Sequence, residues 1–418
     1  MQFVAGAAAQ ADAVYGAIRV AGPSFWADRG RRWTVMGSLT TVGVVTERNW
    51  RAHARRSGGK QGDRRERGHL PFAGGIVGWF GYEAGRWMES MPVPGGERCL
   101  PDAWLGRCDS FACGDRRTGE WWATPDLHAT VRRAQPLPPP LPPPLPPSGR
   151  LPGRRIAEVD RDAFEQGVVC ILDHLRRGDC YQVNLAREVR VSAAGDPLTV
   201  WRRLRANNPA RRAMFVETAD GAVVSNSPEL LLAVHRERLL SIPIKGTSGR
   251  GEDPRLLLES EKERAELTMI VDLVRSDLSR VARPGSVVTG PRRVGGVGHV
   301  WHAMRRVGAE LDRGFDAVDA FAAIFPPGSV IGAPKVRAME VIRALEPTPR
   351  GVYCGAMGWF GDDGDAWWNV AIRTIQFPSA SAGEARFHVG AGIVLDSDPR
   401  REFEETDLKA RRMAEALG

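Results

Sequence analysis

A proline-rich run at residues 135–150, QPLPPPLPPPLPPSGR, is the feature that most restricts how this chain can fold. Proline lacks a backbone N–H and favours the extended polyproline II conformation, so the run cannot belong to a packed core. It divides the chain into an N-terminal part (residues 1–135), a semi-rigid linker (136–150) and a C-terminal part (151–418). A docking site for a proline-binding partner is the alternative role for the run.

Apolar residues in the C-terminal part change between helical and strand periods. Helical spacing predicts helices at residues 160–177, 259–281, 335–345 and 399–417. Short apolar or alternating runs predict strands at 180–191, 213–217, 222–225, 230–234, 355–360, 369–375 and 387–394. Residues 70–89 are rich in glycine and aromatic residues, which is typical of closely packed strands and turns. Because helices and strands do not alternate strictly, we predict an α+β fold with antiparallel sheets.

Composition limits the class of protein. The chain has 418 residues and a net charge of +8, but no basic stripe is interleaved with aromatics, so we expect no nucleic-acid partner. No run of eighteen apolar residues predicts a membrane span, and the first twenty residues do not resemble a signal peptide. The six cysteines show no metal-binding spacing, which favours a reducing cytoplasm.

Lysine is rare in this chain. The chain has five lysines, at positions 60, 245, 262, 335 and 409, and every other residue in the total of 58 lysines and arginines is arginine. A lysine in such a chain indicates a position where guanidinium would not serve, since only ammonium is readily deprotonated. Lys245, in SIPIKGTSGR, is a candidate anion clamp or, with a lowered pKa, a candidate nucleophile.

Two pairs of glutamates suggest a metal site. Glu263 and Glu266 share one face of a predicted helix, and Glu402 and Glu405 have the same spacing in the last helix. Together they would supply the carboxylate oxygens that Mg²⁺ prefers. Each pair alone is also typical of a solvated helix face.

Other polar residues are candidates for acid–base or anion-binding roles. Glu229, after Pro228, is a candidate general acid or base, and His302 or His299 could polarise a leaving group. Arg373 lies on a predicted strand, where an inward guanidinium would need a carboxylate partner. The glycine-rich segments 325–335 and 388–394 could offer backbone N–H groups to an anion, without matching a nucleotide-binding spacing.

Together, these strings resemble those of the chorismate-utilising enzymes, which comprise anthranilate synthase and aminodeoxychorismate synthase large subunits and isochorismate or salicylate synthases. The matching strings, in family order, are GDCYQVNLAREV (178–189), SPELLL (227–232), PIKGT (243–247), KERAELTMIVDLVRSDL (262–278), FPPGSVIGAPKVRAMEVI (325–342), NVAIRT (369–374) and VGAGIVLDSDPRREFEETDLKA (389–410). PFAGGIVGWFGYE (71–83) matches more thinly. The resemblance implies large antiparallel sheets packed as a sandwich, with helices on the outside.

The resemblance also implies roles by position. It implies that Glu266 and Glu405 bind Mg²⁺, with Glu263 and Glu402 beside them. It makes Glu229 the acid or base next to the ring, and places His302 near the leaving group. The implied substrate contacts are the backbone of Gly390, Ala391 and Gly392 to the ring carboxylate, Tyr353 and Arg373 to the enolpyruvyl side chain, and Thr247, Gly328, Ser329 and Lys335 in the same region.

Lys245 distinguishes the subfamilies. Anthranilate synthases usually have alanine in PIAGT, whereas enzymes resembling aminodeoxychorismate synthase have lysine there. The implied reaction is amination of chorismate to 4-amino-4-deoxychorismate, for 4-aminobenzoate and folate synthesis, through a covalent Lys245 intermediate. An anthranilate, isochorismate or salicylate synthase is the alternative within the family. A non-catalytic anion-binding protein is a second alternative, but it would need neither the glutamate pairs nor Lys245.

Two implications concern other molecules. No segment resembles a glutamine amidotransferase, so we expect a separate glutaminase subunit to supply ammonia. The family's N-terminal half often holds a tryptophan pocket, and whether residues 1–135 form one stays open.

Overall fold

The computed structural model describes residues 1–3, 11–20, 22–55, 70–92, 95–134, 155–158, 160–192, 195–297, 300–378 and 383–417. The predicted linker at 136–150 and His299 lie outside these ranges.

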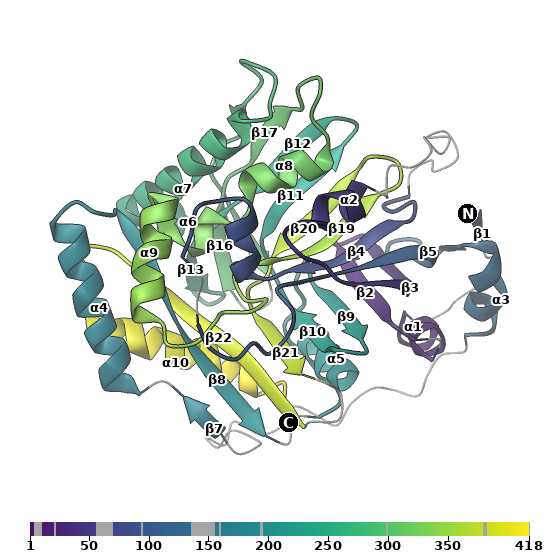
Figure 1. Ribbon diagram of the computed structural model, residues 1–418, viewed down its shortest axis with the longest axis horizontal. Helices are drawn as coiled ribbons and strands as arrows, with labels where there is room; N and C mark the ends of the chain where they lie inside the picture. The colour runs from purple at the N-terminus through teal and green to yellow at the C-terminus, as the bar shows by residue number, and fades with distance from the viewer. Residues whose placement is uncertain are drawn as a thin grey trace.

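One large antiparallel sheet forms the centre of the molecule (Figure 1). Through successive paired neighbours it runs β7 (Arg155–Glu158), β8 (Gln182–Ser192), β22 (Glu384–Ile393), β21 (Thr374–Pro378), β10 (Gly221–Ser225), β9 (Met214–Thr218), β2 (Ser24–Arg29), β3 (Trp33–Val44), β5 (Ala103–Asp115), β4 (Gly75–Phe80), β19 (Ala356–Gly361), β20 (Ala366–Val370), β11 (Leu230–His235), β12 (Arg238–Ile242), β17 (Val307–Glu310) and β14 (Val288–Thr289). Three short strands are added at the sides: β6 (Trp121–Ala123) on β5, β1 (Gln2–Phe3) on β6, and β18 (Gly332–Ala333) on β8. Strands from before the linker pair with strands after it, so both parts of the sequence build one sheet.

Alternating side chains make this sheet a sandwich. In β4, Val77 and Trp79 face an inner cluster, whereas Ile76 and Phe80 face the opposite way into a second cluster. The inner cluster combines residues of β2, β9 and β10 with residues of β4, β19 and β20, so two halves of the sheet pack face to face.

Helices cover both outer faces of the sandwich (Figure 1). One face packs against α2 (Trp50–Arg55), α4 (Arg161–Arg176), α7 (Glu261–Ser279), α8 (Ala317–Ile324) and α9 (Lys335–Leu345). The other packs against α1 (Ala11–Arg19), α3 (Pro125–Arg133), α5 (Pro197–Asn207) and α10 (Pro399–Ala414). The predicted α+β sandwich with outer helices is confirmed. Within the described ranges, no helix is long and apolar enough to cross a membrane.

Smaller elements complete the fold beside α7. A separate three-stranded antiparallel sheet consists of β13 (Ile244–Gly249), β16 (Val300–Met304) and β15 (Arg293–Val297). Helix α6 (Pro254–Glu259) contacts this sheet and α7. Two 3₁₀ helices, η2 (Tyr82–Trp87) and η3 (Gly328–Val330), lie in buried turns.

One predicted strand is wrong. The strand at 369–375 is two strands, because the chain leaves β20 in one half of the sandwich and enters β21 in the other. Arg373 lies in this crossing at φ +52°, not on a strand. The helix predicted at 259–281 is confirmed as α7, which begins at Glu261 because the Ser260 hydroxyl accepts from Glu263 N and separates α7 from the short helix α6.

Candidate active site

Lys245 lies at an irregularity of the small sheet. The register between β13 and β16 shifts between Lys245 and Thr247. Gly246, at the shift, has φ +80°, and a Cβ on it would collide with the carboxylate of Glu263 on α7. The glycine of PIKGT therefore permits both the bulge and the close approach of α7.

The Lys245 side chain reaches β22, the strand with the predicted ring-carboxylate site. A Cβ on Gly392 would lie 3.6 Å from Lys245 Nζ and 2.7 Å from Gln182 Nε2. Because Gly392 has no side chain, an ammonium group and an amide group approach its backbone closely.

Gly390, two residues away on the same face of β22, is approached just as closely. A Cβ there would lie 2.9 Å from Tyr353 Oη and 3.0 Å from Asn184 Nδ2. Asn184 is 9% exposed, and its Nδ2 is buried without a hydrogen-bond partner among the described residues. A buried amide donor in this state is suited to a ligand oxygen.

Lys245 and Glu229 influence each other's protonation. Burial lowers the pKa of Lys245, and the Lys409 ammonium adds to this effect, whereas the nearby glutamates oppose it. Burial raises the pKa of Glu229 to about 7, although a hydrogen bond from Ser329 and the charge of Lys245 act in the opposite direction. The site thus pairs an amine that is more easily deprotonated than usual with a carboxyl group that titrates near neutrality.

His302 links the small sheet to Arg373. Its Nδ1 is 3.0 Å from Thr247 Oγ1, and Arg373 donates to its Nε2 at 3.2 Å. Because guanidinium has no acceptor, Nε2 must be unprotonated and Nδ1 must carry the hydrogen. Burial and the Arg373 charge lower the pKa of His302 to about 3, so the ring is neutral and can polarise a group but not act as an imidazolium acid.

One glutamate pair lies on α7 and the other lies on α10, the helix that also carries Lys409. Glu266 accepts from Gln182 Nε2 at 3.4 Å, and Glu405 pairs with Lys409 at 2.7 Å. Lys409 in turn donates to the carbonyl of Gly390 at 2.8 Å. Both pairs therefore border the strand that carries the site glycines.

The donor chemistry of these pairs fits Mg²⁺. Burial and the adjacent Glu266 raise the pKa of Glu263. Burial, and less strongly Glu405, raises the pKa of Glu402. A cation would relieve this like-charge repulsion. The two pairs are not gathered into one cage, since among the described residues no group of three or more His, Cys, Asp or Glu side chains could hold a metal ion.

The remaining predicted residues have structural partners. Gly328 packs against Leu273 of α7, where a side chain would collide. Lys335 is 6% exposed and donates to Asp277 of α7 at 2.7 Å, so its charge is already paired. Tyr353 stacks on His388 with ring centroids 5.5 Å apart.

Sequence reasoning missed Gln182 and Asn184. Both lie in the string at 178–189, and their spacing of two puts them on one face of a strand. That spacing was the available signal, but only the pairing of β8 with β22 places this face beside the site glycines.

Known proteins resemble this chain over most of its length. A profile of the chorismate binding enzyme family matches residues 23–415. Aminodeoxychorismate synthase component 1 of Bacillus subtilis is 37% identical over 366 residues, covering 83% of this chain and 77% of the relative. An anthranilate synthase component 1 of Haloarcula marismortui is 38% identical over 389 residues, covering 85% and 78%. The crystal structure of anthranilate synthase component I from Streptococcus pneumoniae superposes with a TM-score of 0.77 at 27% identity, covering 92% of both chains.

Proposed function

This chain belongs to the chorismate binding enzyme family, and we propose that it is the aminating subunit of an aminodeoxychorismate synthase. The reaction would convert chorismate and ammonia to 4-amino-4-deoxychorismate and water. The observation that carries the proposal is Lys245: its amine lies 3.6 Å from the point that a Cβ on Gly392 would occupy, and burial lowers its pKa.

In the proposed mechanism, amination with retention takes two displacements. Neutral Lys245 Nζ attacks C2 of the ring, both ring double bonds shift (C1=C2 to C1=C6 and C5=C6 to C4=C5), and the C4–O bond breaks. Ammonia then attacks C4, both ring double bonds shift back, and the C2–Nζ bond breaks to free the lysine. A covalent intermediate divides one difficult substitution into two easier steps.

Glu229 is suited to move the protons of both steps. With a pKa raised to about 7, it is partly protonated at neutral pH. It would donate a proton to the departing 4-hydroxyl, which leaves as water, and then accept one from the incoming ammonia. The hydrogen bond from Ser329 and the charge of Lys245 both favour the ionised form of this carboxyl group, which opposes the effect of burial.

Other residues would bind and orient the substrate. The faces of Gly390 and Gly392 would receive the ring carboxylate, and Tyr353 and Arg373 the enolpyruvyl side chain. Glu266 and Glu405, with Glu263 and Glu402 beside them, are the residues that would hold Mg²⁺ once the two pairs are drawn together, and the ion would supply a Lewis acid at the ring carboxylate. Neutral His302 holds Arg373 in place through Nε2.

The ammonia would come from a partner. We infer a separate glutaminase subunit, which the "component 1" names of the relatives support. High concentrations of ammonium should replace this partner in an assay.

The test is to identify the product. The protein is incubated with chorismate, Mg²⁺ and ammonium at pH 9, and the product is identified by mass and by conversion to 4-aminobenzoate with a lyase. The 38% identical anthranilate synthase makes anthranilate the main competing product. Anthranilate or isochorismate as the product would refute the proposal.

A further inference from the structure

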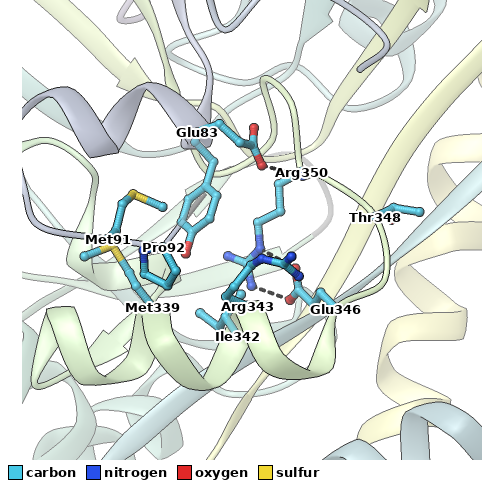
Figure 2. Close-up of a pocket in the computed structure, with 10 residues that line it drawn as sticks. Glu83, Met91, Pro92, Met339, Ile342, Arg343, Glu346, Thr348 and Arg350 are labelled. Atoms are coloured by element: carbon cyan, nitrogen blue, oxygen red, sulfur yellow. Dashed lines mark hydrogen bonds and ion pairs between the residues drawn. The ribbon is translucent and has the colours of Figure 1, made fainter. Parts of the chain in front are cut away.

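Arg350 is the centre of a buried hydrogen-bond network next to the site strand β8 (Figure 2). It is 1% exposed, and its guanidinium donates to both oxygens of Glu346, at 2.6 Å and 2.8 Å. Its backbone N–H donates to Glu83 at 2.8 Å, and Gly351 N donates to the other Glu83 oxygen at 3.0 Å. Figure 2 shows Arg350 between these two carboxylates. Glu346 ends α9, and Glu83 comes from before the linker, so the network joins both parts of the sequence.

The Arg350–Glu346 pair also completes an open edge of β8. On the edge away from β22, β18 pairs with residues 182–183 and β7 with 189–191, and no described strand pairs with the stretch between them. There, Arg350 donates to the carbonyl of Asn184 at 2.7 Å, and Glu346 accepts from Ala186 N at 2.8 Å. One donor and one acceptor thus replace the backbone groups of a missing strand.

This edge lies directly behind the site. In the β8–β22 register, Asn184 faces Gly392 and Ala186 faces Gly390. Any movement of β8 at this point changes the space beside both glycines.

The same guanidinium also contacts two other segments that carry candidate site residues, the turn with Ser329 and the ring of Tyr353. It donates to the carbonyl of Val330 at 3.2 Å, next to Ser329, which hydrogen-bonds Glu229. It also lies 5.9 Å from the ring centroid of Tyr353. A single planar, multidentate cation therefore contacts three elements that carry site residues.

We propose that Arg350, oriented by Glu346, is a positioning residue of the active site. It sets the position of β8 opposite the glycines, of the turn that holds Ser329, and of Tyr353, without touching the substrate. The inference rests on the proposed function only in taking chorismate as the substrate, whichever product is formed.

The test uses Arg350→Lys, which keeps the charge but loses the planar fork. The matched control is Arg205→Lys, since Arg205 also pairs with a buried carboxylate, Asp28, at 2.8 Å and stacks on Trp26 at 4.2 Å. It lies on α5, against the opposite face of the sandwich. Chorismate consumption is followed at a temperature well below both melting temperatures, and exchange of the Ala186 amide hydrogen is measured in the same samples.

The expected result is a roughly 10- to 100-fold fall in kcat for Arg350→Lys, with faster exchange at Ala186, because small displacements of site groups have effects of this size. Arg205→Lys should keep kcat within about twofold, even if its melting temperature falls as much. Glu346→Asp, which withdraws an oxygen from Ala186 N–H but keeps the charge pair, should lower kcat in the same direction and serves if Arg350→Lys does not fold.

Two outcomes would overturn the inference. One is unchanged kcat in the folded Arg350 or Glu346 variant, and the other is an equal loss of kcat in Arg205→Lys. The identity of the product bears only on the proposed function, because consumption of chorismate is measured independently of what it becomes.

Discussion

Gly392→Ala is the sharpest test of where the substrate lies. The added methyl group would lie 2.7 Å from Gln182 Nε2 and 3.6 Å from Lys245 Nζ. The closest atom is the end of a flexible side chain, so Gln182 can move aside, and we expect the folding cost to stay near the low end of the 1–3 kcal/mol typical of overpacking. The methyl group would then occupy the space proposed for the ring carboxylate.

The expected effect is on the reaction more than on the fold. Displacing the substrate by about 1 Å should lower kcat/KM by roughly 100-fold. Gly390→Ala is predicted to differ, because its methyl group would lie 2.8 Å from the Leu185 carbonyl, a backbone atom that cannot rotate away. That variant should lose stability as well as activity.

The assay is chorismate consumption under saturating Mg²⁺ and ammonium, with thermal unfolding measured on the same samples. Gly16→Ala on α1 is the control, because a Cβ there meets nothing within 4 Å. It should keep full activity and gain slight stability, as expected of alanine within a helix. If Gly392→Ala kept kcat/KM within threefold of the wild-type value, the substrate would not bind against the glycine face of β22.

Three further predictions concern the proposed chemistry. Lys245→Arg should fold but lose amination by at least about 1,000-fold, because guanidinium cannot become a neutral nucleophile, whereas an anion clamp would tolerate the change. A mass increase of chorismate minus one water on wild-type Lys245, trapped without ammonia, checks the same step. Burial raises the pKa of Glu229 and of Glu83 to about 7, above their unfolded values, so both bind protons more tightly when folded. Stability should therefore fall as the pH rises from about 4.5 to 7, by up to about 3 kcal/mol per group, and Glu83→Gln should flatten this slope in urea titrations at several pH values. Chelation of divalent ions should abolish turnover, and added Mg²⁺ should restore it. The Glu266→Gln variant should need a higher Mg²⁺ concentration than the wild type for the same rate. Full activity in the presence of chelator would exclude the proposed metal role.

Several features could be read from the sequence because they depend on neighbouring residues. The short apolar run that forms β11 and the helical stripe of α7 each arise from local geometry, so the element types and the antiparallel α+β class were predictable. The crossing at Arg373 was not, because an apolar run looks the same whether it continues along one strand or passes between two sheet halves.

The candidate site shows the same division. Local strings identified Lys245, Glu229, His302 and the glycines, since the residue types and their spacing carry the chemistry. The neutral state of His302 depends on Arg373, which is 71 residues away, and the pairing of Lys335 depends on Asp277, 58 residues away. No sequence pattern encodes such encounters.

By itself, the sequence determined the classes of side chain available to this protein and the helices and strands that carry them. Tertiary structure alone decided which of those side chains meet. The proline-rich run separates the two parts of the chain in sequence, yet β2 pairs with β9 and β4 with β19, and Glu83 holds the backbone at Arg350. The physical reason is that protonation states and backbone pairing depend on burial and distance, and both are set only when strands remote in sequence pack together.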